Sequence, residues 1–216
     1  MTMRQNSDAL IAELVDGLEP VKPLRFGEGV ALALIAAAVT VVAVVAVYGL
    51  RAEWLAGHLD PMQLVSTGLF LGLAVAASVT VVVMGRPQVG NDHGGWRWAA
   101  AMAGFLPLAG VIVALARGTE TISPEVMRHG VECLASGSAS SLLVFALLVL
   151  WLRRGAPTSP SRAGLVAGVA AGAFGIFAAS LHCSDNDIVH IGVWHSAAVV
   201  AMGLVGRVVV PPLIKW

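Results

Sequence analysis

Residues 29–50 read GVALALIAAAVTVVAVVAVYGL and include no charged side chain. A helix needs about 20 apolar residues to cross the ~30 Å hydrocarbon core of a bilayer. Five further apolar runs of similar length follow, at residues 62–85, 98–116, 130–152, 163–181 and 188–208. Backbone groups in lipid must be hydrogen-bonded within their own segment, which favours helices. We therefore predict an all-α bundle of six transmembrane helices over residues 29–216, preceded by a short leader, residues 1–28.

The composition excludes several classes of protein. Hydrophobic residues make up 57% of the chain and charged residues 12%, whereas soluble domains carry about 25% charged residues. The 13 basic and 13 acidic residues balance, so there is no electrostatic basis for direct nucleic-acid binding. The first apolar run begins only after residue 28 and is too long for a signal peptide. We expect it to be retained as the first span.

Basic residues predict the orientation in the membrane. Segments outside the spans fall alternately on two sides. One side carries Arg4, Lys22, Arg25, Arg86, Arg97, Arg153, Arg154, Arg162, Arg207 and Lys215, and the other carries Arg51, Arg117 and Arg128. Positive residues concentrate on the cytoplasmic side of a membrane protein. We therefore expect a multi-pass protein of the bacterial inner membrane with both termini in the cytoplasm.

This orientation places the two cysteines of the chain, Cys133 and Cys183, together on the periplasmic side. His129 lies four residues before Cys133, and His182 and His190 flank Cys183. An oxidising compartment permits a disulfide or a redox-active thiol pair. Thiolate, imidazole and carboxylate groups also suit a zinc-like or copper-like ion, with His129, Cys133, His182, Cys183 and His190 as candidate ligands. The sequence requires no cofactor and leaves staple, switch and thiol-binding metal site open.

Glycines recur at helical spacing in two of the spans. Gly164, Gly168 and Gly172 lie four residues apart, as do Gly68 and Gly72. Small residues at this spacing let membrane helices approach closely. We expect helix packing at both sites, and a candidate homo-oligomer face at Gly164, Gly168 and Gly172. The stripe Cys133, Gly137 and Ser141 is expected to meet the glycines of the fifth span, which would bring the two cysteine-bearing helices together.

The leader contains an amphipathic helix. Residues 8–18 read DALIAELVDGL, with Ser7 or Asp8 as the expected N-cap and Gly17 and Pro20 as the expected end. One stripe is apolar and consists of Leu10, Ile11, Leu14, Val15 and Leu18. A helix this short is unstable alone, and its acidic residues disfavour an anionic bilayer surface. We predict that the stripe docks into a groove of a cytoplasmic protein partner.

Motifs for catalysis and transport are missing. The chain has no P-loop and no nucleophile elbow, so we do not expect an enzyme. No charge stands in the middle of a span, whereas ion-coupled transporters usually keep ionisable groups there. A small transporter or metal-binding membrane protein with an outer Cys/His site remains the alternative. A membrane oxidoreductase is disfavoured because paired histidines for haem are hard to find.

Together these segments resemble the NrsF family of bacterial membrane anti-sigma factors. The resemblance rests on the leader from Leu10 to Arg25 with its Pro20-Val21, on the two cysteine motifs at residues 129–134 and 181–183, on the basic turn at residues 153–157, and on Trp194-His195. Ser184 departs from the proline expected after the second motif cysteine. The resemblance implies that the leader sequesters an extracytoplasmic-function sigma factor. It also implies that the outer cysteine pair senses a stress signal, redox or metal, that releases the factor.

Overall fold

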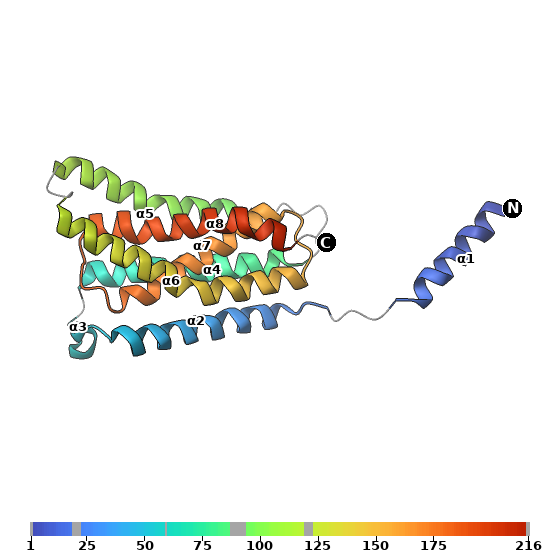
Figure 1. Ribbon diagram of the computed structural model, residues 1–216, viewed down its shortest axis with the longest axis horizontal. Coiled ribbons are helices and arrows are strands. Elements are labelled where there is room, and N and C mark those ends of the chain that lie inside the picture. The colour runs from blue at the N-terminus through green and yellow to red at the C-terminus, as the bar shows by residue number, and fades with distance from the viewer. Residues whose placement is uncertain (1, 19–22, 59, 87–93, 119–122, 215–216) are drawn as a thin grey trace.

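A computed structural model of the chain describes residues 2–18, 23–58, 60–86, 94–118 and 123–214. Every regular element in this part of the chain is a helix, which confirms the predicted all-α class (Figure 1). The elements are α1 (Thr2–Asp16), α2 (Phe26–Tyr48), α3 (Ala52–Ala56), α4 (Pro61–Met84), α5 (Gly95–Arg117), α6 (Pro124–Arg154), α7 (Pro160–Ser180), η2 (His190–His195) and α8 (Ser196–Leu213). Six helices, counting η2 and α8 as one, are long and apolar enough to cross a membrane, and each overlaps one expected run.

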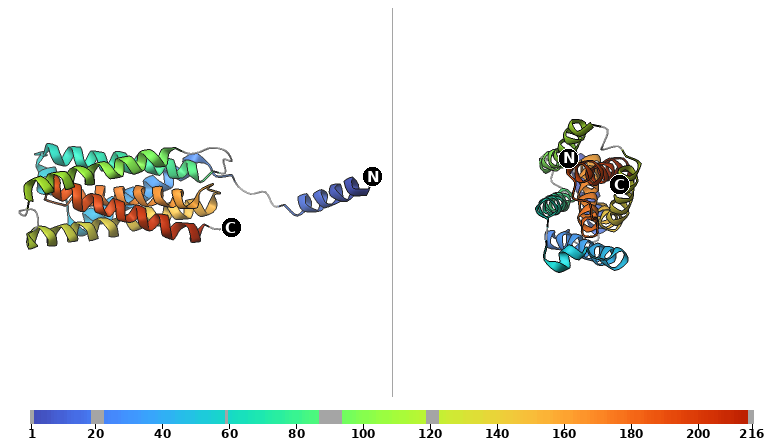
Figure 2. Two further views of the ribbon diagram at one scale, coloured as in Figure 1. Left: turned by 90° about the horizontal axis from the view of Figure 1, so that it is seen from above. Right: turned by 90° about the vertical axis from the view of Figure 1, so that its left-hand side faces the viewer.

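Helix α7 forms the centre of the bundle, surrounded by the other spans (Figures 1 and 2). Of the residues in its most apolar window, 89% are buried, against 22% for α2 and 18% for α5. Its sequence is rich in alanine and glycine, and small side chains allow close approach of several neighbours at once. Because α7 ends at Ser180, the central helix leads directly into the loop that carries Cys183.

The glycines of α7 pack within the chain. Gly164, Gly168 and Gly172 all lie against the backbone of α8, around residues 199–210. This surface is therefore buried inside the bundle, and the proposed homo-oligomer face at these three glycines is wrong. A fourth glycine, Gly175, contacts the carbonyl of Gly137 and the backbone of Ser141 in α6. The expected contact between the two cysteine-bearing helices therefore exists and uses Gly175.

The glycine pair of the second span behaves differently. A Cβ atom at Gly68 or Gly72 would have no neighbour within 4 Å. These two glycines lie on the face of α4 that points away from the bundle, so the packing expected from their spacing is wrong. Spacing alone does not show which way a helix face points.

Helix α1 starts earlier than the leader sequence suggested. It begins at Thr2, so Ser7 and Asp8 lie inside it and the cap expected there is wrong. Good helix formers at residues 3–5 (Met, Arg, Gln) extend the helix in the N-terminal direction. Pro20, Val21 and Lys22 lie outside the described residues. The five apolar side chains of the stripe are each more than half exposed and so are not buried against the rest of the chain.

The bundle has two distinct ends. The start of α2 and the end of α8 lie at one end, on the side of α1, while α3 and the α7–η2 loop lie at the opposite end (Figure 1). Six crossings return the chain to the side from which it started. The leader and the cysteine motifs therefore occupy opposite ends of the bundle.

Candidate thiol and histidine site

Helix α6 brings the first cysteine motif into one helical turn. Ser123 caps the helix, because its hydroxyl oxygen accepts a hydrogen bond from the N–H of Val126 at 3.3 Å, and Pro124 follows at the first helical position. The helix therefore starts six residues before the expected span at residue 130. His129 and Cys133, four residues apart, consequently project from the same face.

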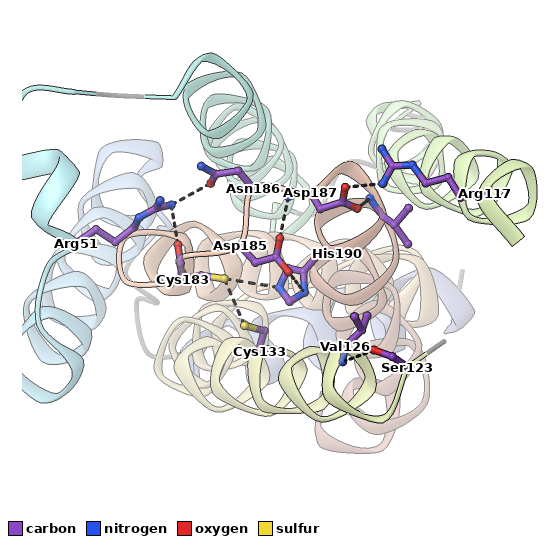
Figure 3. Close-up of polar contacts among 11 residues, drawn as sticks. Arg51, Arg117, Ser123, Val126, Cys133, Cys183, Asp185, Asn186, Asp187 and His190 are labelled. Carbon is purple, nitrogen blue, oxygen red and sulfur yellow. Dashed lines mark hydrogen bonds and ion pairs between the residues drawn. The ribbon is translucent and has the colours of Figure 1, made fainter. Parts of the chain in front are cut away.

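The second motif lies in the loop after α7. The N–H of Cys183 still bonds to the carbonyl of Ala179 at 3.0 Å, so the chain turns tightly where the helix ends. This turn directs the thiol of Cys183 toward α6. Its sulfur lies 3.4 Å from that of Cys133, and both cysteines are free and buried (Figure 3).

Two histidines lie beside the thiol pair. The Sγ atom of Cys183 lies 3.6 Å from Nε2 of His190, and the rings of His129 and His190 are 5.1 Å apart. One donor atom from each of His129, Cys133, Cys183 and His190 lies within 4.8 Å of the other three. We call these four residues the thiol–histidine cluster.

The π-helical turn η2 places a further histidine behind the cluster. Residues 190–195 form this turn, a feature often found at functional sites. It sets the ring of His195 4.9 Å from that of His190. Both rings are 2% exposed, and neither ring nitrogen of His195 has a hydrogen-bond partner among the described residues. A small polar cavity beside His195 is lined by Gln63, Thr67 and other side chains.

His182 lies outside the cluster, although the sequence made it a candidate ligand. Its ring stacks on that of Tyr48 from the end of α2, with centroids 4.6 Å apart and planes 13° apart. Burial lowers the pKa of His182, because the cation loses hydration. His182 and Cys183 are adjacent in sequence but therefore face different ways where α7 ends.

Two arginines hold the Cys183 loop from opposite sides. Arg51 donates from Nη1 to the carbonyl oxygen of Cys183 at 2.7 Å and to Oδ1 of Asn186 at 2.9 Å. From the end of α5, Arg117 forms an ion pair with Asp187 (Figure 3). No sequence motif assigned these two arginines to the site. The sequence feature that could have pointed to them is the charge distribution, because Arg51 and Arg117 are two of the three basic residues on the side poor in positive charge.

Carboxylates shape the loop between the arginines. Oδ1 of Asp185 accepts from the N–H of Asp187 at 2.8 Å, and Oδ1 of Asp187 accepts from that of Val189 at 2.8 Å, so these side chains form the turn that starts the last span. Partial burial raises the pKa of Asp187, but the bonds from Arg117 and Val189 outweigh it and leave the pKa below its usual range. Oδ2 of Asp185 lies 3.3 Å from Nδ1 of His190, an electrostatic contact without hydrogen-bond geometry.

The two thiols are not equivalent. A hydrogen bond from Cys133 holds the pKa of the Cys183 thiol below its ordinary value, against the opposing effect of burial, and His190 acts in the same direction. The thiolate is the form that attacks electrophiles and binds metals. Cys183 is therefore the more reactive of the pair.

The arrangement supports two kinds of chemistry. A disulfide has an S–S bond of about 2.05 Å, so the sulfurs need to approach by roughly 1.3 Å. Two thiolates and two imidazoles also form a common tetrahedral donor set for zinc. An open cavity of about 650 Å³ leads to the thiols, lined by Tyr48, His129, Glu132, Ser136, His182 and neighbours. Small solutes therefore have a route to both sulfur atoms.

Comparison with known proteins identifies the family. Residues 14–216 match the sequence profile described as NrsF, negative regulator of sigma F. The chain belongs to the NrsF family. It is 30% identical to the anti-sigma-F factor NrsF of Caulobacter vibrioides over 97% of both chains. It is 27% identical to the probable anti-sigma-F factor NrsF of Azospira oryzae, over 72% of this chain and 73% of that one. No solved structure matches the chain.

Membership of the NrsF family settles the broad class of the protein. The family is one of anti-sigma factors, so this chain is a membrane protein with a regulatory role and a sigma factor as partner. The resemblance found in the sequence is thereby confirmed at the level of the family.

Proposed function

We propose that this chain holds an extracytoplasmic-function sigma factor at the inner membrane and releases it when a signal reaches the thiol–histidine cluster on the periplasmic side. The observation that carries the proposal is the position of the cluster. Two free thiols lie 3.4 Å apart beside two histidines, at the end of the bundle opposite the leader. A cytoplasmic effector segment and a distant reactive site are the two parts that a transmembrane switch needs.

The leader is the segment proposed to bind the sigma factor. Leu10, Ile11, Leu14, Val15 and Leu18 are between 56% and 72% exposed. An amphipathic helix with an uncovered apolar stripe suits docking into a hydrophobic groove. The charge asymmetry of the sequence supports a cytoplasmic position for it.

A binding assay with the full chain in lipid nanodiscs tests the role of the leader. We expect Leu14→Glu to weaken capture of the sigma factor at least tenfold, because it puts a charge in the docked stripe. Ala9→Glu adds the same charge on the opposite face of α1 and is expected to stay within threefold of the wild type. Equal binding by both variants would show that the leader is not the docking segment.

The signal at the cluster is proposed to act on the thiols. Binding of a zinc-like ion displaces two thiol protons and joins Cys133, Cys183, His129 and His190 around one centre. A hydroperoxide oxidises the two thiols to a disulfide and is itself reduced, taking up the two thiol hydrogens. Either event draws the Cys183 loop toward α6 and changes the packing at this end of the bundle.

Cobalt(II), which has visible absorption bands when bound to thiolates, tests the metal branch on the reduced protein. We expect His190→Gln to weaken Co²⁺ binding at least tenfold. His182→Gln removes the neighbouring histidine that stacks on Tyr48 and is expected to leave the affinity within threefold. If the two variants bind equally, His190 is not a ligand. Release of the sigma factor by hydroperoxide but not by Co²⁺ would favour the disulfide.

The donor set of the thiol–histidine cluster also suits a second function, that of a small metal transporter. Uptake of Co²⁺ into liposomes containing the purified protein distinguishes it from a sensor. A sensor binds the ion stoichiometrically and moves none across the membrane.

A further inference from the structure

Helix α2 is the span continuous with the leader, and its far end touches the loop of Cys183. The chain leaves α2 at Tyr48, whose ring stacks on His182, and turns at Arg51, which binds the carbonyl of Cys183. The cysteine loop therefore contacts one end of α2, and the other end of α2 is the one from which the chain leads back to the leader (Figure 1).

Arg51 forms several hydrogen bonds with this loop. Besides its bonds to Cys183 and Asn186, its backbone N–H donates to the carbonyl of Leu181 at 3.2 Å. The residue is 9% exposed. Its Nε pairs with Glu53 of α3 at 3.4 Å, so the guanidinium joins the loop to the α2–α3 corner. Because a buried guanidinium is costly to deprive of hydrogen bonds, Arg51 follows the loop when the loop moves.

Helix α2 packs against the bundle through a narrow face, whose buried side chains in the core are small: Ala33, Ala36 and Ala37. An open cavity of about 280 Å³ lies beside this face, lined by residues of α2 from Thr40 to Tyr48 and of α6 from Ala139 to Leu143, and the 650 Å³ cavity at the thiols continues along the same side. At the leader end, Gly29 packs on the indole of Trp151, with a Cβ position 2.8 Å from Cζ2. A helix that meets its neighbours through a narrow face of small side chains can slide along them as a rigid rod when one end is displaced.

We propose that Arg51 is the positioning residue that transmits the state of the thiol–histidine cluster to α2 and so to the leader. The inference rests on the proposed function and adds the route by which the cluster controls the sigma factor. Movement of Cys183 toward Cys133 displaces the carbonyl that Arg51 binds. The α2–α3 corner follows, and α2 shifts at the end that carries the leader.

The test measures coupling between the two ends of the full chain in nanodiscs under reducing conditions. For each variant, the affinity for the sigma factor captured by the leader is measured with and without saturating Co²⁺. We expect Co²⁺ to weaken the wild-type affinity at least tenfold. In Arg51→Gln the same ratio is expected to fall below twofold, with the Co²⁺–thiolate absorption and the metal-free sigma affinity retained.

The matched control is Arg117→Gln. Arg117 binds the same loop through Asp187, but it belongs to α5, which does not continue into the leader. Its coupling ratio is expected to equal that of the wild type. A ratio lost equally in both arginine variants would show a general loosening of the loop and overturn the assignment of Arg51.

The outcomes separate this inference from the proposed function. If Co²⁺ leaves the wild-type sigma affinity unchanged and hydroperoxide does too, the proposed function itself fails. If the wild type responds and Arg51→Gln responds equally, the relay alone is overturned. Should Arg51→Gln fail to bind Co²⁺, Arg51→Lys decides. Lysine keeps the charge but has a single nitrogen, whereas Arg51 binds the loop through Nη1 and Glu53 through Nε. The coupling ratio of Arg51→Lys is expected to drop at least threefold, and an unchanged ratio overturns the relay.

Discussion

Replacing Gly168 by alanine tests how tightly α7 and α8 must pack. A Cβ atom at this position would lie 2.6 Å from the carbonyl carbon of Met202 and 2.8 Å from Cα of Gly203. Carbon atoms in good contact are about 3.5 Å apart or more, so the helices must separate locally by roughly 1 Å. The clashing atoms are backbone and cannot rotate away.

The expected cost follows from two opposing effects. Overpacking a well-packed interface costs about 1–3 kcal/mol, and a clash with backbone belongs at the upper end. Replacing a helical glycine by alanine stabilises the helix by about 1 kcal/mol, because alanine has the higher helix propensity. The net loss is therefore about 2 kcal/mol, which for a chain of this length lowers Tm by roughly 4–8 °C.

Gly68→Ala is the matched control, since a Cβ atom there would meet nothing within 4 Å. This variant gains helix propensity without a steric clash. Its Tm is therefore expected to equal that of the wild type or to be up to ~4 °C higher. The two variants are compared by thermal unfolding in the same detergent, monitored by intrinsic tryptophan fluorescence. Equal Tm values for Gly168→Ala and Gly68→Ala would refute the packing of α7 on α8.

Three further predictions concern the thiols, the loop and the leader end of the bundle. In Cys133→Ala the pH profile for alkylation of Cys183 should lie at higher pH than in Cys133→Ser, because alanine offers no hydrogen bond to the thiolate and so no longer lowers its pKa; coincident profiles would contradict this. Asp187→Ala should cost at most about 1 kcal/mol at pH 7, since the ion pair with Arg117 is partly in water. The folded state lowers the pKa of Asp187, so this contribution is present above the unfolded value and the Tm gap should close as pH falls below about 4. Trp151→Ala should lower the free energy of unfolding by roughly 3–5 kcal/mol, because Trp151 is 1% exposed and packs against Gly29 and Gly85; a loss below about 1 kcal/mol in SDS titration would contradict that packing.

The side poor in positive charge carries three basic residues, and each of them has a specific partner. Arg51 and Arg117 bind the Cys183 loop, and Arg128 pairs with Glu132 one turn along α6 at 3.1 Å. All three therefore have local partners at the end of the bundle that carries the cysteines. An orientation rule treats them as exceptions, whereas the structure gives two of them a role in shaping the site.

Local sequence features predicted the elements but not their contacts. Apolar runs of sufficient length made the six spans evident, because a bilayer imposes one length and one kind of secondary structure. The sequence also predicted that the two cysteine-bearing helices meet, because the stripe Cys133, Gly137 and Ser141 could pack on the glycines of the fifth span, but it left the role of the two thiols open. Which histidines joined them did not follow, because that depends on how α7 unwinds and on the π-helical turn at residues 190–195.

The sequence alone determined the membrane class, the six-span topology, the amphipathic leader and the family, since each depends on composition or on patterns within one segment. Only the tertiary structure decided that His190 rather than His182 joins the thiols, that Gly164, Gly168 and Gly172 pack against α8, and that Arg51 ties α2 to Cys183. These contacts join residues that are far apart in the chain or face opposite ways from adjacent positions. Their geometry is fixed by the packing of whole helices, and periodicity along a single segment carries no record of it.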